Sequence, residues 1–346
     1  MKVVVAIDSF KGSMTSMQAG NACKEGILAA AHAHCGSGAA AAKDRKPAAD
    51  NMKVVVKPLA DGGEGTVEAL VEGMSGTYEY VPVTGPMGNP VKARYGILPD
   101  QTVVMEMAEA SGITLVKEPL NPWKAASTGV GEMILDAVQK GCRKFIIGIG
   151  GSATTEGGIG MLSALGYDFM DENGDILPPV FASLEKVVQI ENNRVPEMLK
   201  DCHFQIACDV TNPLCGVEGC VYVFGAQKGV KEEEKESMDR AMQSYAACME
   251  KFTGKKFSEI PGTGAAGGLG FAFLWGLPNV ELKPGIDIVL EAVGLASELQ
   301  DADIVVTGEG CLDFQTAMGK VPVGVAKAAK QYGCEHHRYE TMMQAH

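Results

Sequence analysis

The sequence predicts an α/β protein. Short runs rich in Val and Ile alternate with longer stretches in which apolar residues recur at helical spacing. Several of the short runs are apolar at every position, which is typical of strands in a parallel sheet covered by helices on both faces. Glycine accounts for 43 of the 346 residues, and many glycines lie in turns between the apolar runs. These three observations favour alternating strands and helices rather than an all-helical or all-strand protein.

The elements follow from these runs. The expected strands are Lys2–Asp8, Lys53–Lys57, Thr102–Met107, Lys144–Ile149, Phe204–Asp209 and Asp303–Thr307. The expected helices are Thr15–Ala31, Ser127–Gln139, Glu232–Phe252 and Val321–Tyr332. His32–Met52 is rich in Ala and lacks an apolar stripe, so it is predicted to be a surface insertion. Only a short polar tail follows Tyr332, so no further apolar strand is expected there and the sheet formed by the chain ends is predicted to be incomplete.

Composition excludes several classes of protein. A net charge of −13 argues against binding to nucleic acid or to an anionic membrane, which both need a basic face. No apolar run reaches the about 18 residues of a membrane span, and no targeting signal is visible. The ten Cys are scattered without a Cys-x-x-Cys pair, which indicates free thiols in a reducing compartment, and we expect a cytoplasmic protein. A small anionic ligand remains compatible, because nearby groups set the local field.

Several catalytic and binding motifs are absent or weak. The Walker A pattern does not occur, which excludes a standard P-loop ATPase. Gly262–Gly267 matches a dinucleotide fingerprint, but it follows a poor strand and lacks the acidic partner about 20 residues later. Five of the six His lie in the insertion and the tail, so a Ser–His–Asp hydrolase is not expected. The spacing of Cys202, Cys208, Cys215 and Cys220 fits no common zinc pattern.

The segment from Phe145 to Gly158 is the most informative part of the chain. An apolar strand runs into Gly150, Gly151 and Ser152, and a helix is expected from about Thr155 to Leu165. Glycines let the backbone approach an anion, hydroxyl groups can donate to it, and the positive end of a following helix adds to the field. The functional interpretation is a cradle for phosphate or carboxylate. A tight turn without a ligand is the alternative.

Four further strand-end loops carry acidic residues. They are Asp8–Ser13, Asp61–Thr66, Asp209–Pro213 and Thr307–Asp313. Ligands of α/β sheets bind beyond the carboxyl ends of the strands, so these loops are predicted to converge on one cleft. Carboxylates there can hold a divalent metal or accept a proton from an alcohol, and Lys11 can supply positive charge. Each loop alone is most simply interpreted as a turn. The presence of four such loops in one chain favours a functional role for them.

Several segments of the sequence resemble a known family and occur in the same order as in that family. They are Asp8–Ser13, Ala60–Thr66, Glu106–Gly112, Gly148–Thr154, Ala207–Leu214, Gln227–Gly229, Gly264–Gly270, and Thr307–Thr316 with Gly319 and Lys320. In this order they resemble the bacterial type of glycerate kinases, the type 1 family of glycerate 2-kinases. The resemblance extends from residue 1 to about residue 330.

The resemblance implies a reaction and a domain arrangement. The reaction is phosphorylation of D-glycerate by ATP with Mg²⁺, giving 2-phosphoglycerate. The implied Rossmann-like domain joins both chain ends (1–66 with 292–346), a second α/β domain (67–291) is inserted, and the site lies in the interdomain cleft. Three departures are visible, and the first is that the insertion His32–Met52 is longer than the family leads us to expect. Glu156 stands where the family commonly has Asp, and the polar tail replaces a strand and further α/β structure.

On this basis the site residues receive hypothetical roles. The phosphate or carboxylate cradle is assigned to Gly150, Gly151, Ser152 and Thr154. Lys11 would neutralise an anion, and Asp209, with Asp313 as second choice, would accept the proton of the glycerate hydroxyl. Asp61 and Glu64 would hold Mg²⁺ or orient the substrate. Ser9, Glu309 and Lys320 complete the expected set of substrate- and phosphate-binding residues.

Alternatives to this function remain open in the sequence. A chain with an incomplete terminal sheet could be a catalytically impaired protein or a non-catalytic binder of small acids. A kinase of another small hydroxy acid is also compatible, because the sequence does not fix the size of the pocket. Nor does the sequence choose between the 2- and 3-hydroxyl groups. The expected partner is a small molecule, and a homodimer is compatible with the sequence.

Overall fold

The computed structural model describes residues 1–36, 52–310, 320–332 and 338–342. By its internal contacts the chain divides into two compact units. We call them the terminal unit (1–61, 65–76 and 284–346) and the middle unit (62–64 and 77–283). Both contain parallel strands and helices, which confirms the α/β class. Most of the expected insertion, residues 37–51, lies outside the described residues, whereas residues 32–36 continue the first helix.

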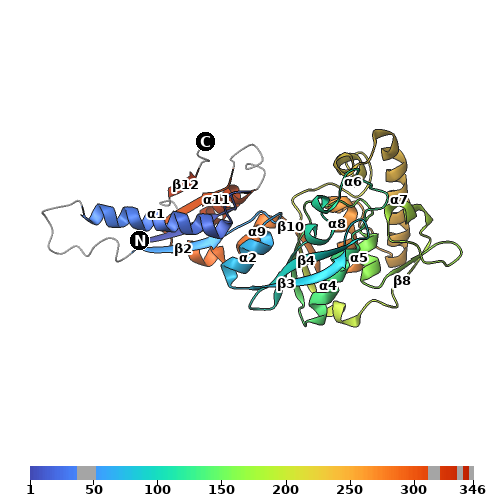
Figure 1. Ribbon diagram of the computed structural model, residues 1–346, viewed down its shortest axis with the longest axis horizontal. Coiled ribbons are helices and arrows are strands. Elements are labelled where there is room, and N and C mark those ends of the chain that lie inside the picture. The colour runs from blue at the N-terminus through green and yellow to red at the C-terminus, as the bar shows by residue number, and fades with distance from the viewer. Residues whose placement is uncertain (37–51, 311–319, 333–337, 343–346) are drawn as a thin grey trace. The chain divides into compact units, whose positions relative to one another are not determined.

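The terminal unit contains a parallel sheet of four strands in the order β12-β11-β1-β2 (Figure 1). Its strands are β1 (Lys2–Ile7), β2 (Lys53–Pro58), β11 (Ile304–Gly308) and β12 (Arg338–Met342). Val3 lies opposite Ile304 on one side and Val54 on the other, so β1 is central. Every residue of β1 is buried, which explains its unbroken apolar run.

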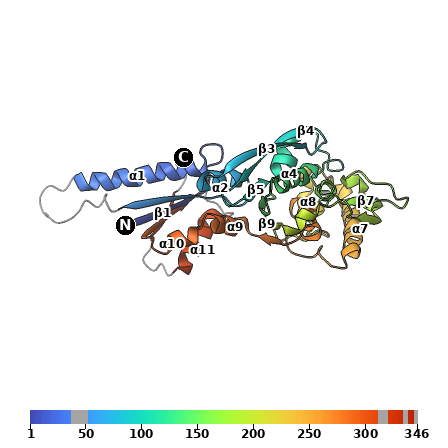
Figure 2. The same ribbon diagram turned by 90° about the horizontal axis from the view of Figure 1, so that it is seen from below.

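Helices cover both faces of this sheet. They are α1 (Ser16–Gly36), α2 (Thr66–Met74), α9 (Gly285–Ala292), α10 (Leu295–Leu299) and α11 (Val321–Gln331). Figure 2 shows α1 on one face, with α10 and α11 on the other. Val3, Val5 and Ile7 pack with Ala19 of α1 in a small apolar core. The parallel strands therefore have the two-sided cover that their sequences predict.

The expectation of no strand after the last helix is wrong. Arg338–Met342 form β12, which pairs in parallel with β11, and Arg338 lies opposite Ile304. An edge strand needs backbone pairing with one neighbour only, so it can be polar in sequence where a central strand cannot. A strand at the edge of this sheet therefore need not be an apolar run in the sequence.

The middle unit is built on a six-stranded sheet in the order β10-β9-β6-β5-β4-β3. Its strands are β3 (Thr77–Thr84), β4 (Pro90–Ile97), β5 (Thr102–Glu106), β6 (Lys144–Gly148), β9 (His203–Ala207) and β10 (Val280–Lys283). Strands β5, β6, β9 and β10 run parallel to one another, whereas β4 runs antiparallel to both β5 and β3. A separate antiparallel pair joins β7 (Asp168–Met170) to β8 (Gln189–Glu191).

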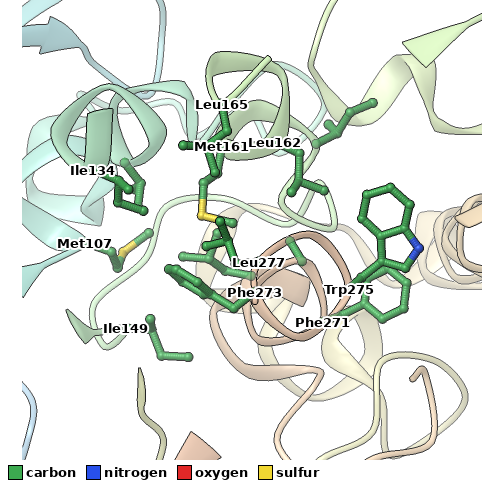
Figure 3. Packing of buried hydrophobic residues seen from close by; sticks show 14 of the residues in the cluster. Met107, Ile134, Ile149, Met161, Leu162, Leu165, Phe271, Phe273, Trp275 and Leu277 are labelled. Atoms are coloured by element: carbon green, nitrogen blue, oxygen red, sulfur yellow. The ribbon is translucent and has the colours of Figure 1, made fainter. Parts of the chain in front are cut away.

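Helices and short 3₁₀ turns complete the middle unit. The helices are α3 (Ala108–Ser111), α4 (Thr128–Gln139), α5 (Ile159–Ala164), α6 (Cys220–Phe224), α7 (Lys235–Thr253) and α8 (Ala265–Gly276). The 3₁₀ turns are Ile113–Leu115, Phe181–Lys186, Glu197–Asp201, Ala226–Lys228 and Glu232–Glu234. Figure 3 shows Phe271 and Phe273 of α8 in one apolar core with Met161 and Ile149. Within the residues that the structure describes, no helix is long and apolar enough to cross a membrane.

Candidate active site

A pocket of about 390 Å³ lies within the middle unit, beyond the carboxyl ends of β6 and β9. Residues 149–152 follow β6, and residues 208–210 follow β9. This is where ligands of parallel α/β sheets bind. The pocket is lined by Gly62, Gly63, Ile113, Ile149, Gly150, Gly151, Ser152, Ala207, Cys208, Asp209, Val210, Phe224, Gln227, Lys228, Ala265 and Ala266.

The glycine loop after β6 is held by backbone contacts. The Ile113 N–H donates to the Gly151 carbonyl at 2.8 Å, and the Ala153 N–H donates to the Ser111 carbonyl at 2.9 Å. Gly151 has a φ of 71°, in the left-handed region that favours glycine. Two hydrogen bonds and a left-handed glycine therefore fix the loop, while Gly150 and Gly151 stay exposed at the pocket.

The helix after this loop begins later than the sequence predicts. We expected it from about Thr155, but α5 begins at Ile159 and has six residues. Gly157 and Gly158 have φ values of 66° and 72°, which are incompatible with a right-handed helix. Because the helix is short and starts beyond the loop, its dipole adds little to the field at the pocket.

The positive charge at the pocket comes from Lys228. Its side chain is buried, with 3% of the residue exposed. The Nζ donates to Ser152 Oγ at 2.7 Å and to the Thr154 carbonyl at 2.6 Å. Burial lowers the pKa of Lys228 to about 8, although the charges of Cys220 and Glu156 oppose this shift. The ammonium therefore lies in a site that disfavours charge, next to two neutral oxygens.

Glu156 stabilises the glycine loop on the side away from the pocket. Its carboxylate is completely buried and accepts hydrogen bonds from the Ser127 N–H (2.8 Å) and Oγ (2.5 Å), and from the Gly160 N–H (3.3 Å). Burial raises the pKa of Glu156, and these bonds oppose that rise. Ser127 Oγ in turn accepts from the Met161 N–H. Glu156 thus ties the loop to the starts of α4 and α5 and does not line the pocket.

Thr154 contributes its backbone. Its side chain is fully buried, it does not line the pocket, and its Oγ1 has no hydrogen-bond partner among the described atoms. Its carbonyl accepts from Lys228. The assignment of the Thr154 hydroxyl to the cradle therefore finds no support in this geometry.

A left-handed turn closes another side of the pocket. Ala266, Gly267 and Gly268 have φ values of 52°, 69° and 94° in succession. A Cβ on Gly267 would lie 2.1 Å from the Thr154 carbonyl oxygen, and the Gly157 N–H donates to the Gly267 carbonyl at 2.9 Å. Ala266 keeps the left-handed conformation at a cost of about 1–2 kcal/mol. Such strain is frequent at ligand sites.

Asp209 also lines the pocket, two residues after β9 ends at Ala207. It is exposed, so its carboxylate is accessible to a ligand. The structure therefore places Asp209 together with Gly150, Gly151 and Ser152, as the sequence predicts. The second candidate base, Asp313, lies outside the described residues.

In the terminal unit the strand-end loops are acidic. Asp8 follows β1, Glu309 follows β11, and Asp61 lies beyond the end of β2. Strands β1 and β11 are neighbours at the point where the strand order reverses. Burial, together with the negative charges of Asp61 and Glu309, raises the pKa of Asp8 to about 7. A 2.6 Å hydrogen bond from the Ser9 N–H and the charge of Lys11 oppose the shift.

The remaining predicted residues belong to both units. Lys11 is exposed, and half-buried Lys320 precedes α11; both belong to the terminal unit. Asp61 belongs to the terminal unit, whereas exposed Glu64 belongs to the middle unit. The described part of the chain contains no group of three or more His, Cys, Asp or Glu residues placed to hold a metal ion. The acidic loops therefore form no ready-made metal cage. They fit Mg²⁺ that arrives on phosphates, because such an ion needs only one or two carboxylates.

Sequence reasoning did not identify Lys228 as a site residue. It lies in the Gln227–Gly229 piece, but its burial and its bonds to the loop 76 and 74 residues earlier depend on the tertiary fold. Its place in that piece, before a glycine and after an apolar segment, is a weak signal by itself.

Comparisons with known proteins agree over nearly the whole chain. The profile described as "Glycerate kinase family" matches residues 3–337. A glycerate kinase of Bacillus subtilis (strain 168) is 43% identical over 96% of this chain and 82% of its own length. A glycerate 2-kinase of Escherichia coli (strain K12) is 41% identical over 96% and 83%. A crystal structure described as glycerate kinase 2 from Salmonella typhimurium LT2 superposes with a TM-score of 0.88 at 38% identity, covering 99% of this chain and 91% of that chain.

Proposed function

Because this chain belongs to the glycerate kinase family and is a kinase, we propose that it transfers the terminal phosphoryl group of ATP to the 2-hydroxyl of D-glycerate. The products would be 2-phosphoglycerate and ADP. One observation carries the proposal: the glycine loop after β6 and Asp209 after β9 line the same pocket.

The glycine loop suits the anionic parts of the reaction. Phosphoryl transfer depends on positioning and charge neutralisation more than on covalent chemistry by the protein. The exposed backbone at Gly150 and Gly151, with the Ser152 hydroxyl, can donate hydrogen bonds to a carboxylate or phosphate. Hydrogen bonds from neighbouring backbone hold this loop rigid, so ligand binding need not order it.

Asp209 is the proposed base. Its accessible carboxylate at the pocket can accept the proton that the glycerate hydroxyl loses as it attacks the phosphorus. Asp313 remains the second choice from the sequence.

The acidic loops of the terminal unit suit the metal–nucleotide complex. Asp8, Asp61 and Glu309 form a negative region that a divalent cation would neutralise. We propose that Asp61 contacts Mg²⁺ there, with Glu64 as a further candidate, and that Ser9, Lys11 and Lys320 contact phosphate oxygens. Bound Mg²⁺ would neutralise phosphate charge during transfer. Phosphoryl transfer requires ATP and D-glycerate to be in contact. Under this assignment, residues of both units therefore take part in the same reaction.

A coupled assay of ADP release tests the function. We expect ADP release from MgATP to depend on D-glycerate and to be much slower with L-glycerate, glycolate or D-lactate. Equal rates with another small hydroxy acid would assign the chain a different substrate. Binding of D-glycerate without ADP release would identify a non-catalytic binder. The observation that favoured such a binder, a missing strand after α11, is removed by β12.

A further inference from the structure

We propose that Lys228 binds an oxyanion of the substrate complex in the middle unit's pocket, and that it orients the Ser152 hydroxyl to donate to the same oxyanion. The oxyanion is a carboxylate of the acid or a phosphate of the nucleotide. This inference rests on the proposed function and adds a binding residue to it.

The burial of Lys228 argues for an anionic ligand. Only 3% of the residue is exposed, yet its Nζ bonds to a hydroxyl and a carbonyl, which carry no charge. Moving an ammonium out of water is costly unless a negative group compensates. The charge of Glu156 acts on Lys228, but no ion pair joins the two side chains among the described residues. Lys228 lines the pocket, so an oxyanion bound there would be a direct ionic partner.

The directions of the hydrogen bonds argue for an oriented hydroxyl. An ammonium can only donate, so Ser152 Oγ must be the acceptor in its 2.7 Å bond with Lys228. The Ser152 proton is then free to donate to another acceptor. Because Ser152 also lines the pocket, an oxyanion there could accept from both residues.

A purely structural role explains less. A link between Ser152 and the Thr154 carbonyl could be made by a neutral donor without the cost of burying a charge. The loop is also held independently by bonds from Ile113 and to Ser111. An ammonium is therefore not needed to fix the loop, whereas it is suited to binding an anion.

The test compares Lys228→Met with the matched control Lys255→Met, since Lys255 is an exposed lysine of the same unit. Loss of a charged hydrogen bond to a substrate should raise the KM for one substrate about 10- to 100-fold. A rise for D-glycerate identifies its carboxylate, and a rise for ATP identifies a phosphate. Lys255→Met should match the wild type. Unchanged KM values for both substrates in Lys228→Met would overturn the proposal.

A second variant separates binding from folding. Lys228→Gln keeps a neutral donor near Ser152 and Thr154 but removes the charge. We expect it to fold as the wild type does, by circular dichroism and thermal unfolding, and still to show the raised KM. A normal KM in folded Lys228→Gln would overturn the proposal, because a neutral donor would then suffice.

The pairing with Ser152 has its own readout. If Lys228 acts partly by orienting that hydroxyl, Ser152→Ala should cost much less in Lys228→Met than in the wild type. Effects that simply multiply would contradict the pairing.

Calorimetric binding of D-glycerate and of a non-hydrolysable ATP analogue with Mg²⁺ distinguishes this inference from the proposed function. Lys228-dependent binding of either ligand by a chain without turnover would refute the kinase proposal and support the Lys228 site. Normal turnover and binding in Lys228→Met would support the kinase proposal and refute the Lys228 site.

Discussion

The strand-end loops of the two units differ in the charged groups that they bring together. In the middle unit, the pocket beyond β6 and β9 contains a buried ammonium at Lys228 beside a glycine loop. In the terminal unit, the loops beyond β1, β2 and β11 bring together the carboxylates of Asp8, Asp61 and Glu309. Both use the carboxyl ends of parallel strands, yet the middle pocket combines this ammonium with the carboxylate of Asp209, whereas the terminal loops gather three carboxylates near Lys11. The sheets thus provide position, and the loop residues determine which charge can bind.

This difference suits a reaction between two anions. A kinase must hold a polyanionic nucleotide, its divalent cation and an acceptor, without leaving charges uncompensated. An acidic region suits the cation, and a buried lysine with a glycine loop suits an oxyanion. The net charge of −13 therefore did not predict the buried ammonium at the middle pocket.

The largest expected effect tests the base in the middle unit. Asp209→Asn should lower kcat by about 10²- to 10⁴-fold, because the hydroxyl loses its proton acceptor, with only a small change in the KM for D-glycerate. Steady-state kinetics measures both constants, and Glu218→Gln, an exposed carboxylate of the same unit, is the control. An unchanged kcat would remove Asp209 from the mechanism.

The close packing of Gly267 against Thr154, beside the pocket of the middle unit, can be tested by substitution. A Cβ there would lie 2.1 Å from the Thr154 carbonyl oxygen, in a backbone with a φ of 69°. Gly267→Ala should destabilise the middle unit by more than about 2 kcal/mol, through backbone strain and the clash together. Urea unfolding measures this. Gly141→Ala is the control, since Gly141 has a φ of 94° with open space around it and isolates the strain. Equal losses would show that the contact with Thr154 is unimportant.

The charge in the middle pocket should respond to pH. Burial lowers the pKa of Lys228 to about 8, and the charges of Glu156 and Cys220 act on it as well. Below this value the amine is charged, so affinity for the oxyanion should be full, and it should fall about tenfold per pH unit well above it. The pH profile of kcat/KM would show this decline in the wild type, but not in Lys228→Met. Identical profiles would assign the decline to another group.

The smallest expected effect concerns the terminal unit. Burial and the charges of Asp61 and Glu309 raise the pKa of Asp8 from its ordinary value of 3.8 to about 7 in the folded chain, so the folded state holds a proton that the unfolded state releases between these values. Stability should therefore fall as pH rises through this window. Asp8→Asn should restore about 1–3 kcal/mol above pH 7 and change little at pH 4. Thermal unfolding without nucleotide or divalent cation measures it. Equal gains at both pH values would contradict a charge effect.

The sequence predicted the elements with the strongest apolar signals. All six expected strands and all four expected helices are present, with ends shifted by a few residues at most for nearly all of them. The hairpin of β3 and β4 was not predicted, because Thr77–Thr84 mixes exposed and half-buried residues and lacks an apolar run. Gly262–Gly267 leads into α8 from turn residues rather than from a strand, so it lacks the context of a dinucleotide fingerprint.

The candidate site could be predicted in part. Gly150, Gly151, Ser152 and Asp209 were recognisable because each follows an apolar strand. Lys228 and the left-handed turn at Ala266 were not recognisable, since burial and backbone conformation at those positions arise from contacts with distant segments. The start of α5 was misplaced because the sequence did not reveal the positive φ values of Gly157 and Gly158.

Phosphorus NMR of the mixture formed from D-glycerate and MgATP tests the central claim most directly. We expect a new phosphate ester signal split into a doublet by the single proton on C2, appearing together with ADP. A triplet from the two C3 protons would place the phosphate on the 3-hydroxyl. Inorganic phosphate alone, or no consumption of ATP, would contradict the claim that this chain phosphorylates D-glycerate.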